Sequence, residues 1–310
     1  MRYSRQEILI GENNQKILNE KTIAVVGLGA IGSVTVDLLS RAGVNLIIID
    51  RDIVELNNLQ RQFFNEEDVE KPKALAIRSR LKKINSEIKI SSFAEDLTFE
   101  NINLLSKADL ILDCTDNLET RFLINDFCLK NNKEWIYSAA IKTIGTIKHF
   151  KPKKACFKCI FKEIKGLESC ETAGVLASTT MITASIQADM AIKILTNKET
   201  IDEMIRFDIK NSEIEKIRIK KINCEACKGK YEYLQRKTTI VKSCGEYFQI
   251  TNKPINLKKL KNKLEKLGKV KYYEEYLQYK NIIIFNNGRA LIKAKNEKQA
   301  KSDFSKFIGN

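Results

Sequence analysis

Short apolar runs alternate with helical patterns through the first half of the chain. Five apolar runs predict strands at about residues 22–27, 45–50, 88–94, 109–114 and 134–140. Helical patterns lie between them, at about residues 31–42, 72–84, 101–107 and 118–131. Strands that alternate with helices in this way predict a doubly wound, mostly parallel α/β sheet.

The pattern changes after residue 140. Residues 145–150 predict a further strand, whereas residues 153–173 lack apolar periodicity and predict a mobile crossover loop that passes near the active site. A long helix is expected at about residues 175–196. Residues 204–208 and 215–222 then predict an antiparallel pair of strands. The sheet should therefore have an antiparallel part.

A second, smaller domain is expected at the C-terminal end. Residues 231–237 predict a linker, which separates a first domain at 1–230 from a second at 238–310. The predicted elements of the second domain are strands at about 238–242, 270–273, 276–277, 281–285 and 291–294, and helices at 257–267 and 298–307. Gly268 is a good C-terminal signal for the first of these helices. This mixture predicts a small α+β domain.

Charge is shared unevenly between the two domains. The chain has a net charge of +15, and residues 238–310 hold 16 Lys and Arg against 6 Asp and Glu. A basic domain suggests an acidic protein partner or an RNA. However, its lysines are spread around helix faces without the interleaved aromatic side chains of an RNA-recognition sheet. A solvated lysine-rich surface is therefore the main expectation, and nucleic acid is not an expected partner.

A glycine-rich turn follows the first apolar run. Gly27, Gly29 and Gly32 have the spacing of a Rossmann-like, nucleotide-binding β-α-β unit, and Asp50 ends the next apolar run. Gly27 permits the tight turn, Gly29 lets a phosphate approach the backbone, and Gly32 lets the helix pack against the strand. Asp50 is placed to accept a hydrogen bond from a ribose hydroxyl. These residues alone fit a nicotinamide or flavin enzyme at least as well as an ATP-binding one.

Polar residues further along the chain favour ATP over hydride chemistry. Asn58, Arg61 and Gln62 lie in one short loop that a dehydrogenase has no reason to carry, and Lys73 begins the next helical pattern. These residues are interpreted as ligands of a triphosphate. An exposed lysine at the start of a helix is the alternative interpretation of Lys73.

The predicted strand at 109–114 leads into a polar segment that contains Asp113, Thr115, Asp116 and Asn117. Side chains at the carboxyl edge of a parallel sheet face the ligand crevice. A hard acidic oxygen at this edge suits a magnesium ion carried on phosphates. The segment is therefore a second candidate part of the nucleotide site.

The cysteines give a separate signal. Cys156 with Cys159 and Cys224 with Cys227 form two Cys-x-x-Cys pairs, which together can make a closed, structural Cys₄ zinc site. Two independent redox pairs are the alternative, disfavoured because neither pair opens a helix after a strand. The sequence shows no apolar N-terminal signal and no run of ~18 apolar residues, so a soluble, cytoplasmic protein without membrane association is expected.

The glycine turn, the loop at residues 57–62, Lys73 and the segment at 113–117 together resemble the ThiF/MoeB/HesA family, relatives of the ubiquitin-activating enzymes. The resemblance implies an adenylyltransferase that uses ATP to activate the C-terminal glycine of a small ubiquitin-like protein ending in Gly-Gly. It implies these roles: Asp50 on the ribose; Asn58, Arg61 and Lys73 on the phosphates; Asp116 on magnesium; and Asn117 beside the nucleotide. The four-cysteine zinc site agrees with the resemblance.

The resemblance also covers two residues outside these motifs. Arg5, within residues 2–6, resembles an arginine that relatives donate across a homodimer to the neighbouring ATP. Cys170 stands before an Ala-Gly-Val segment, where the family places a sulfur nucleophile, and a helix start at about residue 175 would favour its thiolate. The alternative for Cys170 is an ordinary loop cysteine. A sulfur-donor protein is a further possible partner.

Two other functions stay open at this point. One is a relative that activates a carboxylate on tRNA, which the paired Cys-x-x-Cys motifs disfavour. The other is a nicotinamide-dependent dehydrogenase, which Arg61 and Lys73 disfavour. Thiamin synthesis, molybdopterin synthesis, tRNA thiolation and protein conjugation all use adenylated carriers, and the sequence does not choose among them.

Overall fold

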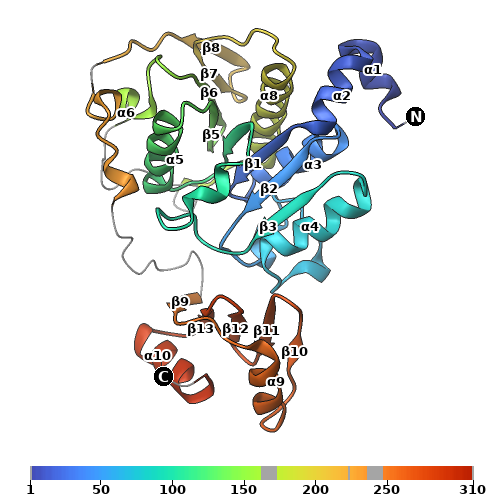
Figure 1. The fold of residues 1–310 in the computed structure, drawn as a ribbon, viewed down its shortest axis with the longest axis vertical. Coiled ribbons are helices and arrows are strands. Elements are labelled where there is room, and N and C mark those ends of the chain that lie inside the picture. Colours follow the sequence, from blue (N-terminus) through green and yellow to red (C-terminus); the bar gives the residue numbers. More distant parts are fainter. Residues whose placement is uncertain (1, 162–172, 223, 236–246, 309–310) are drawn as a thin grey trace. The chain divides into compact units, whose positions relative to one another are not determined.

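The computed structural model describes residues 2–161, 173–222, 224–235 and 247–308. The chain divides into two compact units, Met1–Arg236 and Lys237–Asn310 (Figure 1). No helix among the described residues has the length and apolar character needed to cross a membrane.

The first unit is built on an eight-stranded sheet with the order β3-β2-β1-β4-β5-β6-β7-β8. Its strands are β1 (Thr22–Val26), β2 (Asn45–Ile49), β3 (Ile90–Phe93), β4 (Leu110–Asp113), β5 (Trp135–Ile141), β6 (Ile144–Phe150), β7 (Met204–Asp208) and β8 (Glu213–Ile217). Strands β1 to β5 pair in parallel, and β5 to β8 pair antiparallel. The predicted parallel sheet with an antiparallel part is confirmed.

Helices cover both faces of this sheet because successive strand residues point to opposite sides. One face packs against α3 (Gly32–Arg41), α4 (Lys73–Ile84) and α8 (Ala177–Leu195). The other packs against α5 (Leu118–Lys130), the one-turn helix α6 (Phe157–Ile160) and two 3₁₀ helices, η3 (Ile102–Leu105) and η5 (Glu232–Leu234). The α3 and α5 helices begin at the carboxyl ends of β1 and β4, which places both helix starts at one edge of the sheet.

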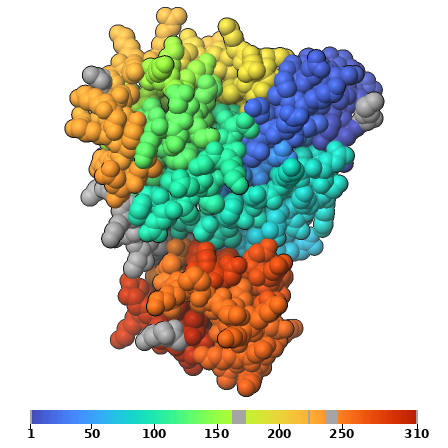
Figure 2. Space-filling view, viewed as in Figure 1, coloured from blue at the N-terminus to red at the C-terminus, as the bar shows by residue number. Residues whose placement is uncertain are grey.

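Three local predictions for the first unit were wrong. Residues 231–235 are not a linker, because η5 packs on α5 and its Tyr233 is 4 % exposed within the core. Residues 224–235, in orange, accordingly lie against α5 on the surface of this unit (Figures 1 and 2). Residues 157–160 of the predicted crossover loop form α6, while its residues 162–172 lie outside the described residues, and the helical pattern at 101–107 forms only η3. The chain also starts with two helices that the pattern did not indicate, α1 (Ser4–Ile10) and α2 (Glu12–Glu20).

The second unit contains a five-stranded antiparallel sheet in the order β10-β11-β12-β13-β9. Its elements are β9 (Tyr247–Thr251), α9 (Leu257–Glu265), β10 (Lys271–Tyr272), β11 (Tyr276–Tyr279), β12 (Ile282–Phe285), β13 (Arg289–Lys293) and α10 (Glu297–Phe307). Both helices pack on one face of the sheet through leucine and phenylalanine side chains. Strand β9 was not predicted, and the predicted strand at 238–242 lies outside the described residues.

Candidate functional site

The glycine turn lies between β1 and α3. Gly27 has φ +88°, a conformation that side chains disfavour, and a Cβ there would meet the Cys114 carbonyl oxygen at 2.8 Å. A Cβ on Gly32 would meet the Gly27 carbonyl oxygen at 1.9 Å. A Cβ on Gly29 would meet nothing within 4 Å. Packing therefore requires glycine at positions 27 and 32. At Gly29 the space beside the backbone is open, so a ligand can approach it.

This contrast predicts different consequences for two alanine variants. Gly32→Ala should lower the free energy of unfolding by about 1–3 kcal/mol or more, because the turn must move to admit the methyl group. Gly29→Ala should leave unfolding unchanged and raise the KM for ATP roughly tenfold or more, about 1.4 kcal/mol of binding. Thermal unfolding and ATP kinetics check both effects. Equal destabilisation by the two variants would contradict the assignment of Gly29 to the phosphates.

Asp50 directly follows β2, and its carboxylate is hydrogen-bonded to the glycine turn. Its Oδ2 accepts a hydrogen bond from the Leu28 backbone N–H at 2.6 Å, and its Oδ1 accepts one from the Asp52 N–H at 2.7 Å. Burial raises the pKa of the Asp50 carboxyl, while Lys73 opposes the rise. Asp50 thus stands directly beneath the glycine turn, where the sequence places the ribose contact.

Lys73 is buried at the start of α4, so an exposed helix-start lysine is excluded. Its Nζ lies 3.5 Å from Oδ2 of Asp52, and its backbone N–H donates to the Asp52 carbonyl. Burial acts to lower the pKa of Lys73, but Asp52, Asp50 and Asp116 outweigh it and raise the pKa. Lys73 is therefore a fixed positive charge among three carboxylates. The sequence reasoning missed Asp52, although its spacing of two residues from Asp50 was visible.

The loop after β2 gives its residues different roles. Asn58 is buried: its Oδ1 accepts from the Glu55 N–H at 3.1 Å, and its Nδ2 donates to Asn57 Oδ1 at 2.7 Å. Asn58 therefore shapes the loop. Arg61 is half-buried, and its Nη1 donates to the Asn57 carbonyl at 2.9 Å. Gln62 is buried with an Oε1 that accepts no hydrogen bond from the described residues.

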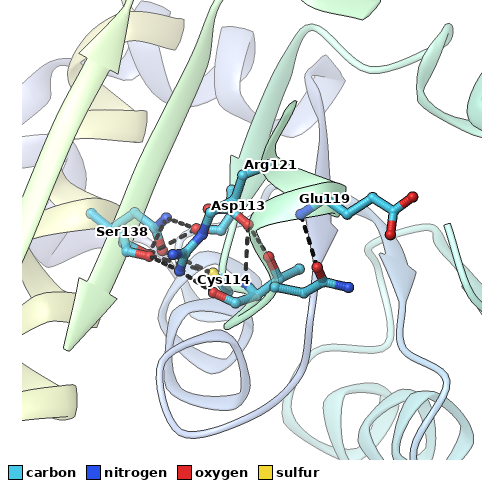
Figure 3. A network of polar contacts seen from close by, with 8 residues as sticks. Asp113, Cys114, Glu119, Arg121 and Ser138 are labelled. Carbon is cyan, nitrogen blue, oxygen red and sulfur yellow. Dashed lines mark hydrogen bonds and ion pairs between the residues drawn. The ribbon is translucent and has the colours of Figure 1, made fainter. Parts of the chain in front are cut away.

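The segment after β4 contains the exposed carboxylate of Asp116. It is preceded by Asp113, which is buried and paired with Arg121 at 3.1 Å (Figure 3). Burial raises the pKa of the Asp113 carboxyl, while Arg121 and the donors of Thr115 oppose the rise. Asn117 caps α5, since its side chain accepts from the Glu119 N–H at 2.9 Å. Asp116 is thus the carboxylate of this segment that is left facing outward.

These parts are brought together at the carboxyl edge of the parallel strands. Strands β1 and β4 are neighbours, and the glycine turn touches the peptide between Cys114 and Thr115. Lys73 is close enough to Asp50 and Asp116 for both to act on its pKa. The arrangement combines an open turn at a helix start, a buried cation and an outward carboxylate, which suits a nucleotide phosphate.

Arg5 is not part of this cluster within its own chain. The Gln6 side chain donates to the Ala42 carbonyl and the Arg2 side chain to the Ile84 carbonyl, at the C-terminal ends of α3 and α4. The glycine turn lies at the opposite end of α3, about 15 Å away along a ten-residue helix. Arg5 itself is exposed. Cys170 lies outside the described residues.

The two Cys-x-x-Cys pairs form one cluster. All four sulfurs, from Cys156, Cys159, Cys224 and Cys227, lie within 4.8 Å of one another. Five of the sulfur pairs are 3.5–3.8 Å apart. A tetrahedral ion with metal–sulfur bonds of about 2.3 Å requires about 3.8 Å between sulfurs, whereas a disulfide requires about 2.05 Å. The cluster therefore fits a closed four-sulfur metal site.

The distances between the sulfurs, rather than the position of the pairs in the sequence, argue against two independent redox pairs. Cys156 does open a helix after a strand, since it is the N-cap of α6 after β6, so the argument from position was wrong. The pairs are nevertheless not independent. Residues 68 positions apart, such as Cys156 and Cys224, bring their sulfurs to 3.5 Å.

Comparison with known proteins agrees with the geometry. Residues 3–228 match the ThiF family. The chain is 34% identical to the sulfur carrier protein ThiS adenylyltransferase of Bacillus subtilis, with 99% of each chain covered. It is also 34% identical to the Escherichia coli protein of that name, across 74% of this chain and 95% of the other. A crystal structure of Escherichia coli MccB with ATP matches the fold with a TM-score of 0.66 at 23% identity, covering 74% of this chain and 75% of MccB. The chain belongs to the ThiF family.

Proposed function

We propose that this protein is an ATP-dependent adenylyltransferase that activates the C-terminal glycine of a ubiquitin-like sulfur carrier protein. The observation that carries the proposal is the arrangement of Gly29, Lys73 and Asp116 at one edge of the sheet, in a chain whose relatives are named as sulfur carrier adenylyltransferases. Those relatives also argue against the dehydrogenase alternative. The basic second unit has a counterpart in the Bacillus subtilis protein, which the chain matches along its whole length.

In the proposed reaction, a carboxylate oxygen of the carrier attacks the α-phosphorus of ATP. A P–O bond forms, the bond to pyrophosphate breaks, and the carrier becomes an acyl-adenylate. Both reactants are anions, so the enzyme must hold them in line and neutralise charge. Lys73 and Arg61 supply positive charge, the open space at Gly29 lets a phosphate approach the backbone, and Asp50 accepts a hydrogen bond from the ribose. Asp116 would hold magnesium, which screens phosphate charge when bound.

The cysteine cluster supports a structural zinc ion. Four thiolates complete a tetrahedral shell and leave no position for water or substrate. The ion would join the segment after β6 to the segment before η5. Tyr233 of η5 and Phe157 of α6 both pack against Phe122 of α5, so the metal would hold two distant segments on one helix.

A homodimer is part of the proposal because the segment around Arg5 contacts the ends of α3 and α4 that lie away from the glycine turn of its own chain. The α1 helix has no buried residue, and its Ile8 and Leu9 are 77 % and 83 % exposed. Met181 and Ile182 on α8 add further exposed apolar surface. Exposed apolar side chains of this kind are typical of protein interfaces. A twofold partner could cover them and donate its own Arg5.

The test is pyrophosphate exchange with candidate carriers, each intact and lacking its terminal glycine pair. Incorporation of labelled pyrophosphate into ATP should require one intact carrier and disappear with its truncated form. Exchange that ignores the carrier tail would contradict the proposed substrate. No exchange with any intact carrier would contradict the adenylation itself.

Cys170 belongs to a later step in the proposal, as the thiol that receives the acyl group or carries sulfur. Cys170→Ala should keep full pyrophosphate exchange and lose conversion of the carrier to its thiocarboxylate. Mass spectrometry of the carrier, after incubation with ATP and a sulfur donor, measures that conversion. Full conversion would show that Cys170 is not needed.

A further inference from the structure

Arg121 is a buried cation that the proposed reaction does not use. It lies on the second turn of α5, and its side chain is only 10 % exposed. Its Nε is 3.1 Å from Asp113 Oδ2, and its Nη2 donates to the carbonyls of Thr115 and Ser138. Its guanidinium also lies over the Tyr137 ring, 4.9 Å from the centroid. One side chain thus contacts the end of β4, the segment after it and β5 (Figure 3).

Arg121 and Asp113 form an ion pair, and both residues contact Thr115. The Thr115 carbonyl accepts from Arg121, while its N–H and its hydroxyl donate to Asp113 Oδ1 at 3.0 and 2.6 Å. All three polar groups of Thr115 are therefore fixed by one ion pair. The next residue is Asp116, whose own carboxylate is exposed. Its backbone position is set by Thr115 before it and by the Asn117 cap after it.

The strand end beneath this segment is fixed as well. The Asp113 carbonyl accepts hydrogen bonds from Ser138 Oγ at 2.8 Å and from Gln187 Nε2 at 3.2 Å. The peptide after Cys114 packs against Gly27 with no room for a methyl group. Arg121 therefore holds the segment at residues 113–117, whose first residues are already fixed by these contacts. Loss of Arg121 would accordingly change the position of Asp116.

Charge gives Arg121 a second effect. Asp113 and Asp116 are close in sequence, and both act on the pKa of Arg121 in the raising direction. Because Arg121 neutralises its charge, the Asp113 carboxylate stays buried at the end of β4. Asp116 is then the exposed carboxylate that can bind a metal. A lysine could keep the charge but not the set of three acceptors, because only the planar guanidinium donates in several fixed directions.

We propose that Arg121 is a positioning residue that sets the metal affinity of Asp116 without touching the nucleotide. This inference rests on the proposed function, in which Asp116 holds magnesium. Residues that orient a metal ligand commonly change metal affinity or activity by about 10–100-fold when they are substituted. The same range is expected here, with little change in the affinity for ATP at saturating metal.

The test compares Arg121→Lys with wild type in direct metal binding. Mn²⁺ affinity of the full chain with a non-hydrolysable ATP analogue, measured by electron paramagnetic resonance, should fall about 10–100-fold. In carrier-dependent exchange, the Mg²⁺ concentration for half-maximal rate should rise by the same factor. The KM for ATP at saturating Mg²⁺ should stay within about twofold. A purely structural role would shift the melting temperature and leave these metal affinities unchanged.

Two further variants keep the test decisive. Thr115→Val removes only the hydroxyl that donates to Asp113, and it should weaken Mn²⁺ binding in the same direction by a smaller factor. If Arg121→Lys does not fold, Mn²⁺ binding by Thr115→Val tests the inference instead. Arg80→Lys is the matched control, because Arg80 pairs at 3.1 Å with Asp37, a carboxylate whose side chain is 5 % exposed, on α3. Arg80→Lys should leave metal affinity unchanged.

Asp116→Asn separates the inference from the function on which it rests. Unchanged Mn²⁺ affinity in Asp116→Asn would overturn the proposed metal role of Asp116. Lower affinity in Asp116→Asn together with wild-type affinity in Arg121→Lys and Thr115→Val would overturn the inference alone.

Discussion

Asp116→Ala should abolish carrier-dependent ATP–pyrophosphate exchange, with a loss of about 10²–10³-fold or more. Asp116 is exposed at the edge of the site, where its removal costs the fold little and takes away the proposed magnesium ligand. Arg61→Ala should have a comparable effect, because its charge would act on the phosphates. Initial exchange rates at saturating carrier and ATP measure both losses.

The control for Asp116 is another carboxylate of the same strand region. Asp109 precedes β4 at the opposite edge of the sheet, where it pairs with Lys21 at 2.8 Å. Asp109→Ala should keep near wild-type exchange. Near wild-type exchange in both Asp116→Ala and Arg61→Ala would rule out the proposed nucleotide site.

Mixing inactive chains extends this test to the dimer. In a mixed dimer of Arg5→Ala and Asp116→Ala chains, one site has an intact Asp116 and receives an intact Arg5 from its partner. Random mixing should therefore restore activity to about a quarter of the sites. Confirmed mixed dimers without activity would mean that Arg5 does not act across the interface.

Removal of the cluster metal should have the second large effect, on stability. Freshly purified protein should contain one zinc per chain, and Cys159→Ser should contain none. Structural zinc contributes directly to folding, and its loss should lower the melting temperature of the first unit by roughly 10 °C, about 4 kcal/mol. Metal analysis and scanning calorimetry measure the two quantities.

Cys128→Ala is the matched control, because Cys128 is buried on α5 outside the cluster. It should retain the zinc even if it lowers stability slightly. Chelation should likewise affect unfolding more than ATP binding by the protein that stays folded. Absence of zinc from fresh wild-type protein would refute the assignment.

The sequence was sufficient for those parts of the fold that follow from local periodicity. The five parallel strands and the helices α3, α4 and α5 form local patterns of regular spacing, so their succession along the chain could be predicted, whereas the pattern at 101–107 gave only η3. The glycine turn, Asp50 and the two cysteine pairs have fixed short spacings and could also be found. By contrast, α1 has no buried face, and its exposed Ile8 and Leu9 give no amphipathic signal toward its own core.

Residues whose role depends on tertiary contacts were missed. In the sequence Arg121 is one more charged residue of a helical pattern, and only the fold shows that it donates to the Thr115 carbonyl. Tyr233 looked like part of a polar linker, but its N–H donates to Asp126 on α5 and its ring stacks on Phe122. Asn58 and Asn117 stay predicted nucleotide ligands, and the fold adds a local role that the sequence did not show: their hydrogen bonds shape the loop and cap a helix.

The glycine turn has a consequence for how sequences of relatives change over evolutionary time. Gly27 and Gly32 are enclosed by backbone atoms, so selection for folding alone retains them, even in a descendant that has lost catalysis. Gly29 borders open space, so only a bound phosphate would keep it small. In a lineage that abandons ATP, position 29 should therefore drift to other residues while positions 27 and 32 stay glycine.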